Sequence, residues 1–442
     1  MSAIAIRASA MLNALAVPEE RPRRVGKLAA YDGLMFEATG FDQPIGAGAR
    51  IVAADGRAAR AEVIGFRADR TLLMALDPDA PYASGARVEP DIGGSMADVG
   101  AALLGRVIDA LGVPLDGLGP IAATDHWPLA GRPGNPLDSA RVTEPFDVGV
   151  RAVNALLTAG IGQRLAIIAG SGAGKSVLLG QMLSGSEAEI NVVGLIGERS
   201  REVSDFIATK LPAGVREKSV VVAVPADHAP LLRLRAAMRA TAIAEHFRAQ
   251  GKKVLLLIDS LTRVAHAQRE IGLSMGEPPT VKGYPPSALG MIPRLVERAG
   301  ADRRTGGSIT ALYTVLADGD DADDPIVDSA RAIADGHILL SRALGEQGVY
   351  PAIDVGRSLS RVMTDVVEPA HARSAGAYRR LWSAYEENRD LILMGAYSIG
   401  GDPTIDEAIA RRAELLDFLR QAPSDSHDFA TSVDALTGAF SA

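Results

Sequence analysis

The chain contains no cysteine, which excludes disulfide bonds, thiol catalysis, iron–sulfur clusters and cysteine-ligated zinc. It also lacks any apolar run near the roughly 18 residues that a membrane-spanning helix requires. Basic residues are in the minority, with 46 Lys and Arg against 54 Asp and Glu, and they form no long run. An acidic chain of this kind is a poor candidate for a general nucleic-acid binder. We therefore expect a soluble protein with no nucleic-acid partner, suited to a reducing cytoplasm.

The length of 442 residues predicts about three domains, preceded by a short N-terminal segment. This segment, residues 1–23, lacks the basic start and apolar middle of a secretory signal. Pro18 and Pro22 end a run with helical spacing of apolar residues, which are Ile4, Ala8, Met11, Leu12 and Leu15. Two interpretations stay open, a frayed terminus and a helix that docks a partner protein.

Residues 24–92 show short alternating runs separated by turn dipeptides, which is typical of a small β-barrel. Residues 93–365 begin with a long ordered connection and then alternate buried strands with helical patterns. The predicted strands are 165–169, 192–196, 220–224, 254–258 and 309–316. This order predicts an α/β domain with a mostly parallel sheet. Residues 366–442 contain no strand-like run after about Asp365 and predict a helical C-terminal domain with helices over 377–387, 390–394 and 405–420.

A strand over 164–168 leads directly into a glycine-rich loop and then into an apolar helix, which predicts a P-loop for the phosphates of a nucleotide. The predicted nucleotide-binding residues are Gly170, Ser171, Gly172, Ala173, Gly174, Lys175, Ser176 and Val177. Lys175 would reach the β- and γ-phosphates, and the Ser176 hydroxyl would ligate Mg²⁺. Ala169 stands where the strict pattern has glycine, which is tolerable if this residue ends the strand with a negative φ.

Two carboxylates follow other predicted strands. Asp259 ends the apolar run 254–258, and at the carboxyl end of a parallel strand it would hold Mg²⁺ through water beside the phosphates. Glu198 follows the run 192–196 and would accept a proton from the attacking water. We favour this catalytic role on the expectation that its strand adjoins the P-loop strand.

Several segments together carry a resemblance to a known family. They are GRVIDALGVPLDG (105–117), GERSREV (197–203), DSLTR (259–263), GEPPTVKGYPP (276–286), YPAID (350–354) and NRDLILMGAY (388–397). In this order they resemble the flagellar and type III secretion export ATPases, which are similar to the catalytic β-subunit of ATP synthase. The resemblance spans about residues 24–420 and implies a homohexamer with a β-barrel, a RecA-like ATPase core and a helical C-terminal domain.

The resemblance also implies roles for single residues. Glu198 corresponds to the catalytic glutamate, and Arg199 and Arg263 correspond to residues near the γ-phosphate. Tyr350 matches the ring that stacks on adenine, and Arg361 matches the arginine finger given to the neighbouring subunit. Ser200 departs from the glycine usual in the family, which is tolerable if it begins a helix with ordinary φ.

Three members of this superfamily compete as interpretations. An RNA translocase needs a basic, aromatic platform in the barrel, which is not evident. An ATP synthase β-subunit has an acidic DELSEED-like segment, whereas residues 407–420 read EAIARRAELLDFLR. We therefore favour an export ATPase, and residues 394–403 (MGAYSIGGDP) favour the flagellar over the virulence-type system. The family implies ATP, Mg²⁺, a stalk-like regulatory partner at the N-terminal helix, export-gate membrane proteins, export substrates and their chaperones, and a peripheral place at the inner membrane.

Overall fold

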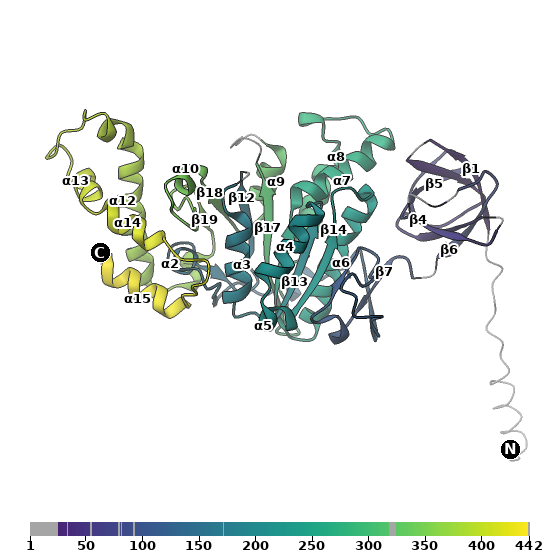
Figure 1. Cartoon of the computed structure of the whole chain (residues 1–442), viewed down its shortest axis with the longest axis horizontal. Coiled ribbons are helices and arrows are strands. Elements are labelled where there is room, and N and C mark those ends of the chain that lie inside the picture. Colours follow the sequence, from purple (N-terminus) through teal and green to yellow (C-terminus); the bar gives the residue numbers. More distant parts are fainter. Residues whose placement is uncertain are drawn as a thin grey trace, which may run out of the picture. The chain divides into compact units, whose positions relative to one another are not determined.

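The computed structural model describes residues 25–32, 34–53, 55–77, 80, 82–91, 93–170, 172–317 and 324–440. They form two compact units, one that ends at Ser95 and one that begins at Met96 (Figure 1). The predicted N-terminal helix lies outside the described residues. None of the helices in this described part of the chain combines the length and the apolar character that crossing a membrane requires.

The first unit is a closed barrel of six strands in the order β1-β2-β5-β4-β3-β6. The strands are β1 (Gly26–Tyr31), β2 (Met35–Thr39), β3 (Gly48–Val52), β4 (Ala58–Arg67), β5 (Arg70–Ala75) and β6 (Arg87–Asp91). Side chains that alternate along the strands fill the interior, among them the fully buried Phe36, Val63 and Leu73. The predicted barrel is therefore confirmed.

The second unit contains one large sheet in the order β19-β18-β12-β17-β15-β13-β14-β8, with β16 paired to β17. Its strands are β8 (Val107–Ile108), β12 (Arg164–Ala169), β13 (Ile190–Ile196), β14 (Ser219–Val224), β15 (Lys253–Asp259), β16 (Gly300–Ala301), β17 (Ser308–Leu316), β18 (Gly336–Leu340) and β19 (Leu359–Ser360). All five predicted strands are present and run parallel.

The expectation that β13 adjoins the P-loop strand β12 is wrong. β17 and β15 lie between the two strands, so β12 pairs with β17 and β18, and β13 pairs with β15 and β14. Strand order depends on the paths of the crossover helices, which the hydrophobic pattern of each strand does not specify.

The helices of the core are α2 (Arg151–Leu156), α3 (Lys175–Gly185), α4 (Ser200–Lys210), α5 (Ala213–Glu217), α6 (Pro230–Ala249), α7 (Leu261–Ser274), α8 (Pro286–Val296), α9 (Pro325–Ile333), α10 (Arg342–Glu346) and α11 (Met363–Val366). Before the sheet, β7 (Met96–Val99) pairs with β9 (Asp125–Pro128), and β10 (Pro145–Phe146) pairs with β11 (Ala159–Gly160). Three single turns of 3₁₀-helix are η1 (Ala101–Leu103), η2 (Pro136–Asp138) and η3 (Val281–Gly283). The long helix α6 packs on β13, β14 and β15.

The C-terminal region is helical, as predicted, and comprises α12 (Pro369–Leu393), α13 (Pro403–Ala410), α14 (Arg412–Leu419) and α15 (Phe429–Ala439). The predicted segments 377–387 and 390–394 belong to the single helix α12, which ends at Leu393, and the predicted helix 405–420 is divided at Arg411 into α13 and α14. Tyr378 of α12 packs against Phe418 and Phe440, and this aromatic cluster joins the helices. Arg151 attaches them to the core, because its guanidinium donates to the carbonyl oxygens of Phe418 and Arg420.

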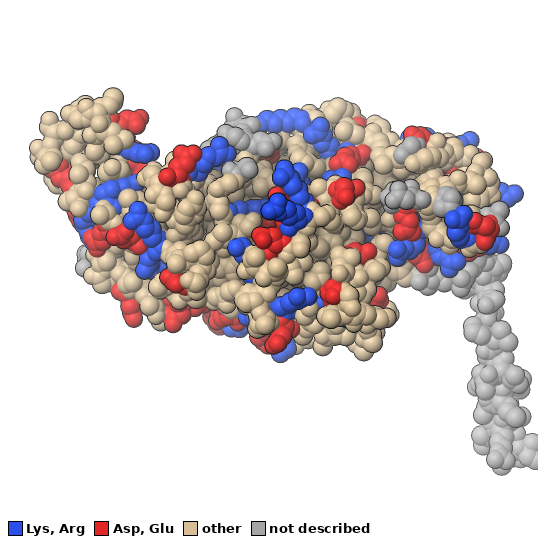
Figure 2. Space-filling model, in the orientation of Figure 1, with Lys and Arg blue, Asp and Glu red and all other residues tan. Residues whose placement is uncertain are grey.

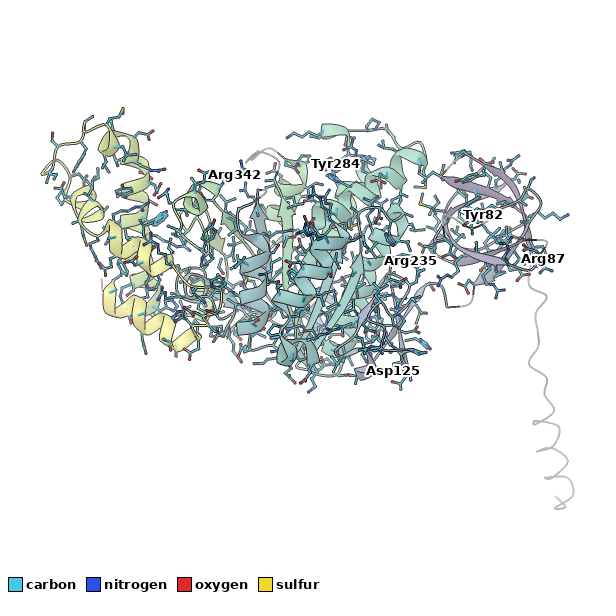
Figure 3. All side chains as sticks on the ribbon, in the orientation of Figure 1. Tyr82, Arg87, Asp125, Arg235, Tyr284 and Arg342 are labelled. Carbon is cyan, nitrogen blue, oxygen red and sulfur yellow. The ribbon has the colours of Figure 1, made fainter. Side chains whose placement is uncertain are left out.

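The carboxyl ends of the parallel strands meet at one edge of the sheet. Arg342, which begins α10 just after β18, and Tyr284, just before α8, lie on this side in Figure 3, and Asp125 lies on the opposite side. The predicted fold class, an α/β core with a mostly parallel sheet, a β-barrel and a helical C-terminal region, is confirmed.

Candidate functional site

The loop between β12 and α3 turns through Gly172 and Gly174, whose φ angles of 80° and 82° suit glycine because they lie in the left-handed region. Ala169 ends β12 and is not among the non-glycine residues with positive φ, so its methyl group is tolerated. Ser171 lies outside the described residues. The first amide groups of α3 have no acceptor within the helix, which suits the loop to hold an anion.

A cleft of about 580 Å³ opens at this loop, and α4 and the ends of β13 and β15 complete its walls. Most of the predicted site residues line it, namely Gly170, Gly172, Gly174, Lys175, Ser176, Val177, Glu198, Arg199, Asp259 and Arg263. Ala173 belongs to the same loop but is buried and does not line the cleft. On the face that Figure 2 presents, acidic and basic side chains are interspersed.

Lys175 connects the loop to both predicted carboxylates. Its Nζ donates to Oδ1 of Asp259 at 2.5 Å and to Oε1 of Glu198 at 3.4 Å. Burial alone would lower the pKa of Lys175, but the charges of the two carboxylates outweigh burial and raise it. The ammonium group is therefore held in its charged form, as phosphate binding requires.

Glu198 follows β13 and lies in the cleft although its strand does not adjoin β12. It comes close to Asp259 because β13 and β15 are neighbours, with Leu195 opposite Asp259. Burial raises the pKa of Glu198, and the charge of Asp259 and a hydrogen bond with Glu202 act in the same direction, against Lys175 and Arg263. A raised pKa makes this carboxylate a better proton acceptor once it is ionised.

Glu202 is a cleft residue that the sequence analysis missed. It lies in the first turn of α4 and hydrogen-bonds to Glu198, four positions earlier. The sequence did contain a signal for Glu202. It is a second acidic residue four positions after Glu198, at the start of the predicted helix. Ser200 begins the same helix, and it is not among the residues with positive φ, so the departure from glycine costs no backbone strain.

Asp259 is the last residue of β15, and only 4% of its side chain is exposed. The cap of the following helix is Ser260, whose hydroxyl accepts from the amide of Arg263. The Asp259 side chain therefore does not cap this helix. Its Oδ1 accepts one hydrogen bond from Lys175 and another, of 2.6 Å, from the Thr314 hydroxyl. Thr314 is a further residue that the sequence analysis did not identify.

The two arginines predicted near the γ-phosphate occupy different depths. Arg263 lines the cleft, and its buried Nε has no acceptor among the described residues. Arg199 lines the rim with 85% of its side chain exposed and lies 3.8 Å from Glu202. The structure brings Arg263 to the carboxylates but leaves Arg199 in solvent.

Tyr350 lies beside the P-loop. A Cβ atom added to Gly174 would be 3.4 Å from two carbons of the Tyr350 ring, and the ring is partly exposed. The main-chain oxygen of Tyr350 accepts from the amide of Gln421, which connects this position to the C-terminal helices. An exposed ring next to the loop is available for stacking on a base.

Arg361 lies away from the cleft. It follows β19, whose Ser360 pairs with Gly336, the first residue of β18, and its amide donates to the oxygen of Asp335. Asp335 in turn donates to the oxygen of Arg164, the first residue of β12. The P-loop follows the other end of this six-residue strand, about 20 Å away at 3.3 Å per residue. The exposed Arg361 therefore lies far from the P-loop of its own chain.

The oxygen donors of the cleft fit Mg²⁺, the metal that the sequence predicts. Ser176 is exposed in the first turn of α3, and Asp259 lies at the end of β15. Lys175 and Thr314 both donate to Oδ1 of Asp259, so among the described residues no donor occupies Oδ2. Mg²⁺ in nucleotide sites is held by one or two such oxygens together with water and phosphate.

Two segments of the chain match families of known proteins. Residues 149–360 match the nucleotide-binding domain of the ATP synthase alpha/beta family. Residues 367–438 match the C-terminal domain of the EscN ATPase of type III secretion systems.

Curated relatives match almost the whole chain. The flagellum-specific ATP synthase of Pseudomonas aeruginosa is 50% identical over 98% of this chain and 96% of its own length. The protein of the same name from Salmonella typhimurium is 50% identical over 94% and 93%. The type 3 secretion system ATPase of Xanthomonas euvesicatoria is 44% identical over 94% of each chain.

Solved structures also match almost the whole chain. The assembled ATPase EscN of enteropathogenic E. coli has a TM-score of 0.88 and 41% identity, and the match covers 94% of this chain and 100% of that one. EscN in complex with its central stalk EscO has a TM-score of 0.85 and 40% identity over the same shares.

Proposed function

This chain belongs to the ATP synthase alpha/beta family, in the branch of flagellum-specific ATP synthases and type III secretion ATPases, and we propose that it drives protein export by the flagellar system. It is an ATP-hydrolysing enzyme. The observation that carries the proposal is the P-loop lysine in contact with two strand-end carboxylates, in a chain half identical to flagellum-specific relatives.

The predicted site residues have roles that their chemistry supports. The P-loop amides and Lys175 bind the phosphates, and Ser176 and Asp259 hold Mg²⁺ in part through water. When bound, Mg²⁺ neutralises the charge that develops on the phosphates. Glu198 accepts the proton of the attacking water, and Arg263 binds the γ-phosphate. Tyr350 stacks on adenine beside the loop, and Arg199 assists from the rim.

The chain works as a homohexamer in this proposal, with Arg361 completing the site of the next subunit. The solved relative EscN is described as assembled, which supports self-association. The position of Arg361 at the amino ends of β12 and β18 supports the same conclusion, because this residue is remote from its own P-loop.

The export system itself is proposed to be flagellar. Relatives from Pseudomonas aeruginosa and Salmonella typhimurium, at 50% identity, support this choice over the virulence-type system, whose Xanthomonas member is 44% identical. The alternative remains a virulence-type secretion ATPase, supported by the match of the C-terminal helices to EscN. A genomic neighbourhood of flagellar structural genes, rather than needle-complex genes, is expected.

Partners follow from the same proposal. A stalk protein is supported by the complex of EscN with its central stalk EscO. We further assign a regulatory stalk-like protein to the N-terminal helix, with export-gate proteins, export substrates and chaperones as further partners and no nucleic acid. The protein then acts in the cytoplasm, peripherally at the inner-membrane export apparatus.

Phosphate release from ATP by the purified protein tests the site. Lys175→Ala is expected to weaken ATP binding by about 10- to 100-fold, because it removes charged hydrogen bonds to phosphate. Asp259→Asn is expected to impair turnover that depends on Mg²⁺. Lys252→Ala is the control, because Lys252 pairs with Glu189 at the opposite edge of the sheet. Wild-type rates from Lys175→Ala or Asp259→Asn would refute the assignment.

Deletion of residues 1–20 tests the proposed partner helix. We expect the shortened protein to fold and hydrolyse ATP, because these residues precede the barrel, but to lose co-purification with its regulatory partner. Retention of the partner by the shortened protein would show that this segment is only a frayed end.

A further inference from the structure

Thr314 is a buried hydroxyl residue in the middle of the sheet. It lies in β17, between the P-loop strand β12 and the strand β15 that ends in Asp259, and it is 0% exposed. Its cross-strand neighbour Ile167 and the adjacent Val315 are apolar and fully buried. A valine would fill the same space, so packing alone does not explain a hydroxyl here.

The hydroxyl has one short hydrogen bond. It donates to Oδ1 of Asp259 at 2.6 Å, with the main-chain oxygen of Ile258 farther away at 3.5 Å. A buried hydroxyl destabilises a protein unless it is hydrogen-bonded, and a bond to a charged acceptor is stronger than a neutral one. The contact with Asp259 therefore accounts for a polar side chain at this position.

The second donor to Oδ1 of Asp259 is Lys175. Lysine is a long, flexible side chain, and in the proposed function Lys175 binds the phosphates of ATP. Thr314 is β-branched and set in the sheet, so it keeps its place whether nucleotide is bound or not. It is then the donor that holds Asp259 after Lys175 has turned to the phosphates.

We propose that Thr314 is a positioning residue of the nucleotide site. By occupying Oδ1, its hydroxyl fixes the plane of the Asp259 carboxylate and keeps Oδ2 available to the hydrated Mg²⁺ of the bound nucleotide. Groups that orient a metal-binding carboxylate commonly change metal affinity by roughly 10- to 100-fold when they are removed. The inference rests on the proposed role of Asp259 in the function above.

Mg²⁺ titration of nucleotide binding tests this inference without any turnover. A fluorescent, non-hydrolysable ATP analogue is bound to the full-length protein, first in EDTA and then with increasing MgCl₂. Thr314→Val keeps the shape but removes the hydroxyl, and Thr314→Ser keeps the hydroxyl. Thr310→Val is the matched control, because this buried threonine of β17 bonds the amide of Gly162 rather than Asp259.

Thr314→Val is expected to bind the analogue in EDTA within about twofold of the wild type, since the P-loop is intact. Its half-saturating Mg²⁺ concentration is expected to rise roughly 10- to 100-fold. Thr314→Ser and Thr310→Val are expected to stay close to the wild type. Thermal unfolding of Thr314→Val and Thr310→Val measures how much stability each variant loses when a buried hydroxyl is removed.

An unchanged Mg²⁺ requirement in Thr314→Val would overturn the inference, and so would equal changes in Thr314→Val and Thr310→Val. Either result, with a wild type that hydrolyses ATP, leaves the proposed function intact. A wild type that binds no nucleotide would overturn both the function and the inference.

Discussion

Glu198→Gln is expected to lower kcat by about 10²- to 10⁴-fold while ATP affinity stays near that of the wild type. The amide keeps the size of the carboxylate but cannot accept the proton of the attacking water. Only the transition state moves that proton, so the loss appears in kcat rather than in binding. Lys175 keeps its contact with Asp259 in this variant, which preserves the phosphate site. Single-turnover phosphate release and equilibrium binding of a fluorescent nucleotide measure the two quantities separately.

The matched control is Glu189→Gln, which makes the same change immediately before β13, at the opposite end of the strand. Glu189 accepts from Lys252 at the surface, so the control is expected to keep its turnover. In the wild type, activity is expected to fall as the pH drops through a value above the ordinary glutamate pKa of 4.5, because burial raises the pKa of Glu198 and only its ionised form accepts a proton. Loss of binding with normal turnover at saturation would instead make Glu198 a structural residue.

Arg361→Ala is expected to bind ATP normally and to hydrolyse it roughly 10³- to 10⁵-fold more slowly. The planar guanidinium suits the charge that accumulates on a transferring phosphoryl group. Arg361 contacts Arg331 and Asp335 at the amino side of its own sheet, so its removal leaves its own P-loop intact. Steady-state rates and nucleotide binding are compared with those of Arg373→Ala, which removes an exposed arginine from α12. Equal turnover in the two variants would remove Arg361 from the reaction.

The sequence predicts most of the core because parallel strands covered on both faces are continuous apolar runs. β12, β13, β14, β15 and β17 are of this kind. β18 is shorter, with burial that alternates along GHILL, so it gives a weaker signal. The barrel strand β6 gives a weak signal too, because Val88 is its single buried apolar residue.

The C-terminal helices show the limits of local patterns in another way. α15 reads FATSVDALTGA, and its threonine, serine and glycine residues are weak helix formers. It forms because Leu436 and the following Phe440 are buried against the aromatic cluster around Tyr378. Tertiary packing outweighs the weak propensity here.

In the cleft, the residues of local motifs could be predicted, whereas Thr314, which contacts one of them, could not. The P-loop is continuous in sequence, and Asp259 directly follows an apolar run. Both could therefore be recognised from the sequence alone. Thr314 lies within a strand 55 positions after Asp259, and only the order β17-β15 brings the two together. Glu198 was predicted at the correct edge of the sheet although the predicted strand order was wrong. This is because the parallel strands all end at that edge.

Mixing Arg361→Ala with Glu198→Gln tests most directly whether each site is shared between two subunits. Each variant alone is expected to be nearly inactive. Rings that contain both present some interfaces where an intact Arg361 meets an intact Glu198, so the mixture is expected to recover part of the wild-type rate. The recovered rate should rise steeply with protein concentration as rings form. No recovery at any ratio, with wild-type activity strictly proportional to concentration down to the monomer, would contradict the shared site.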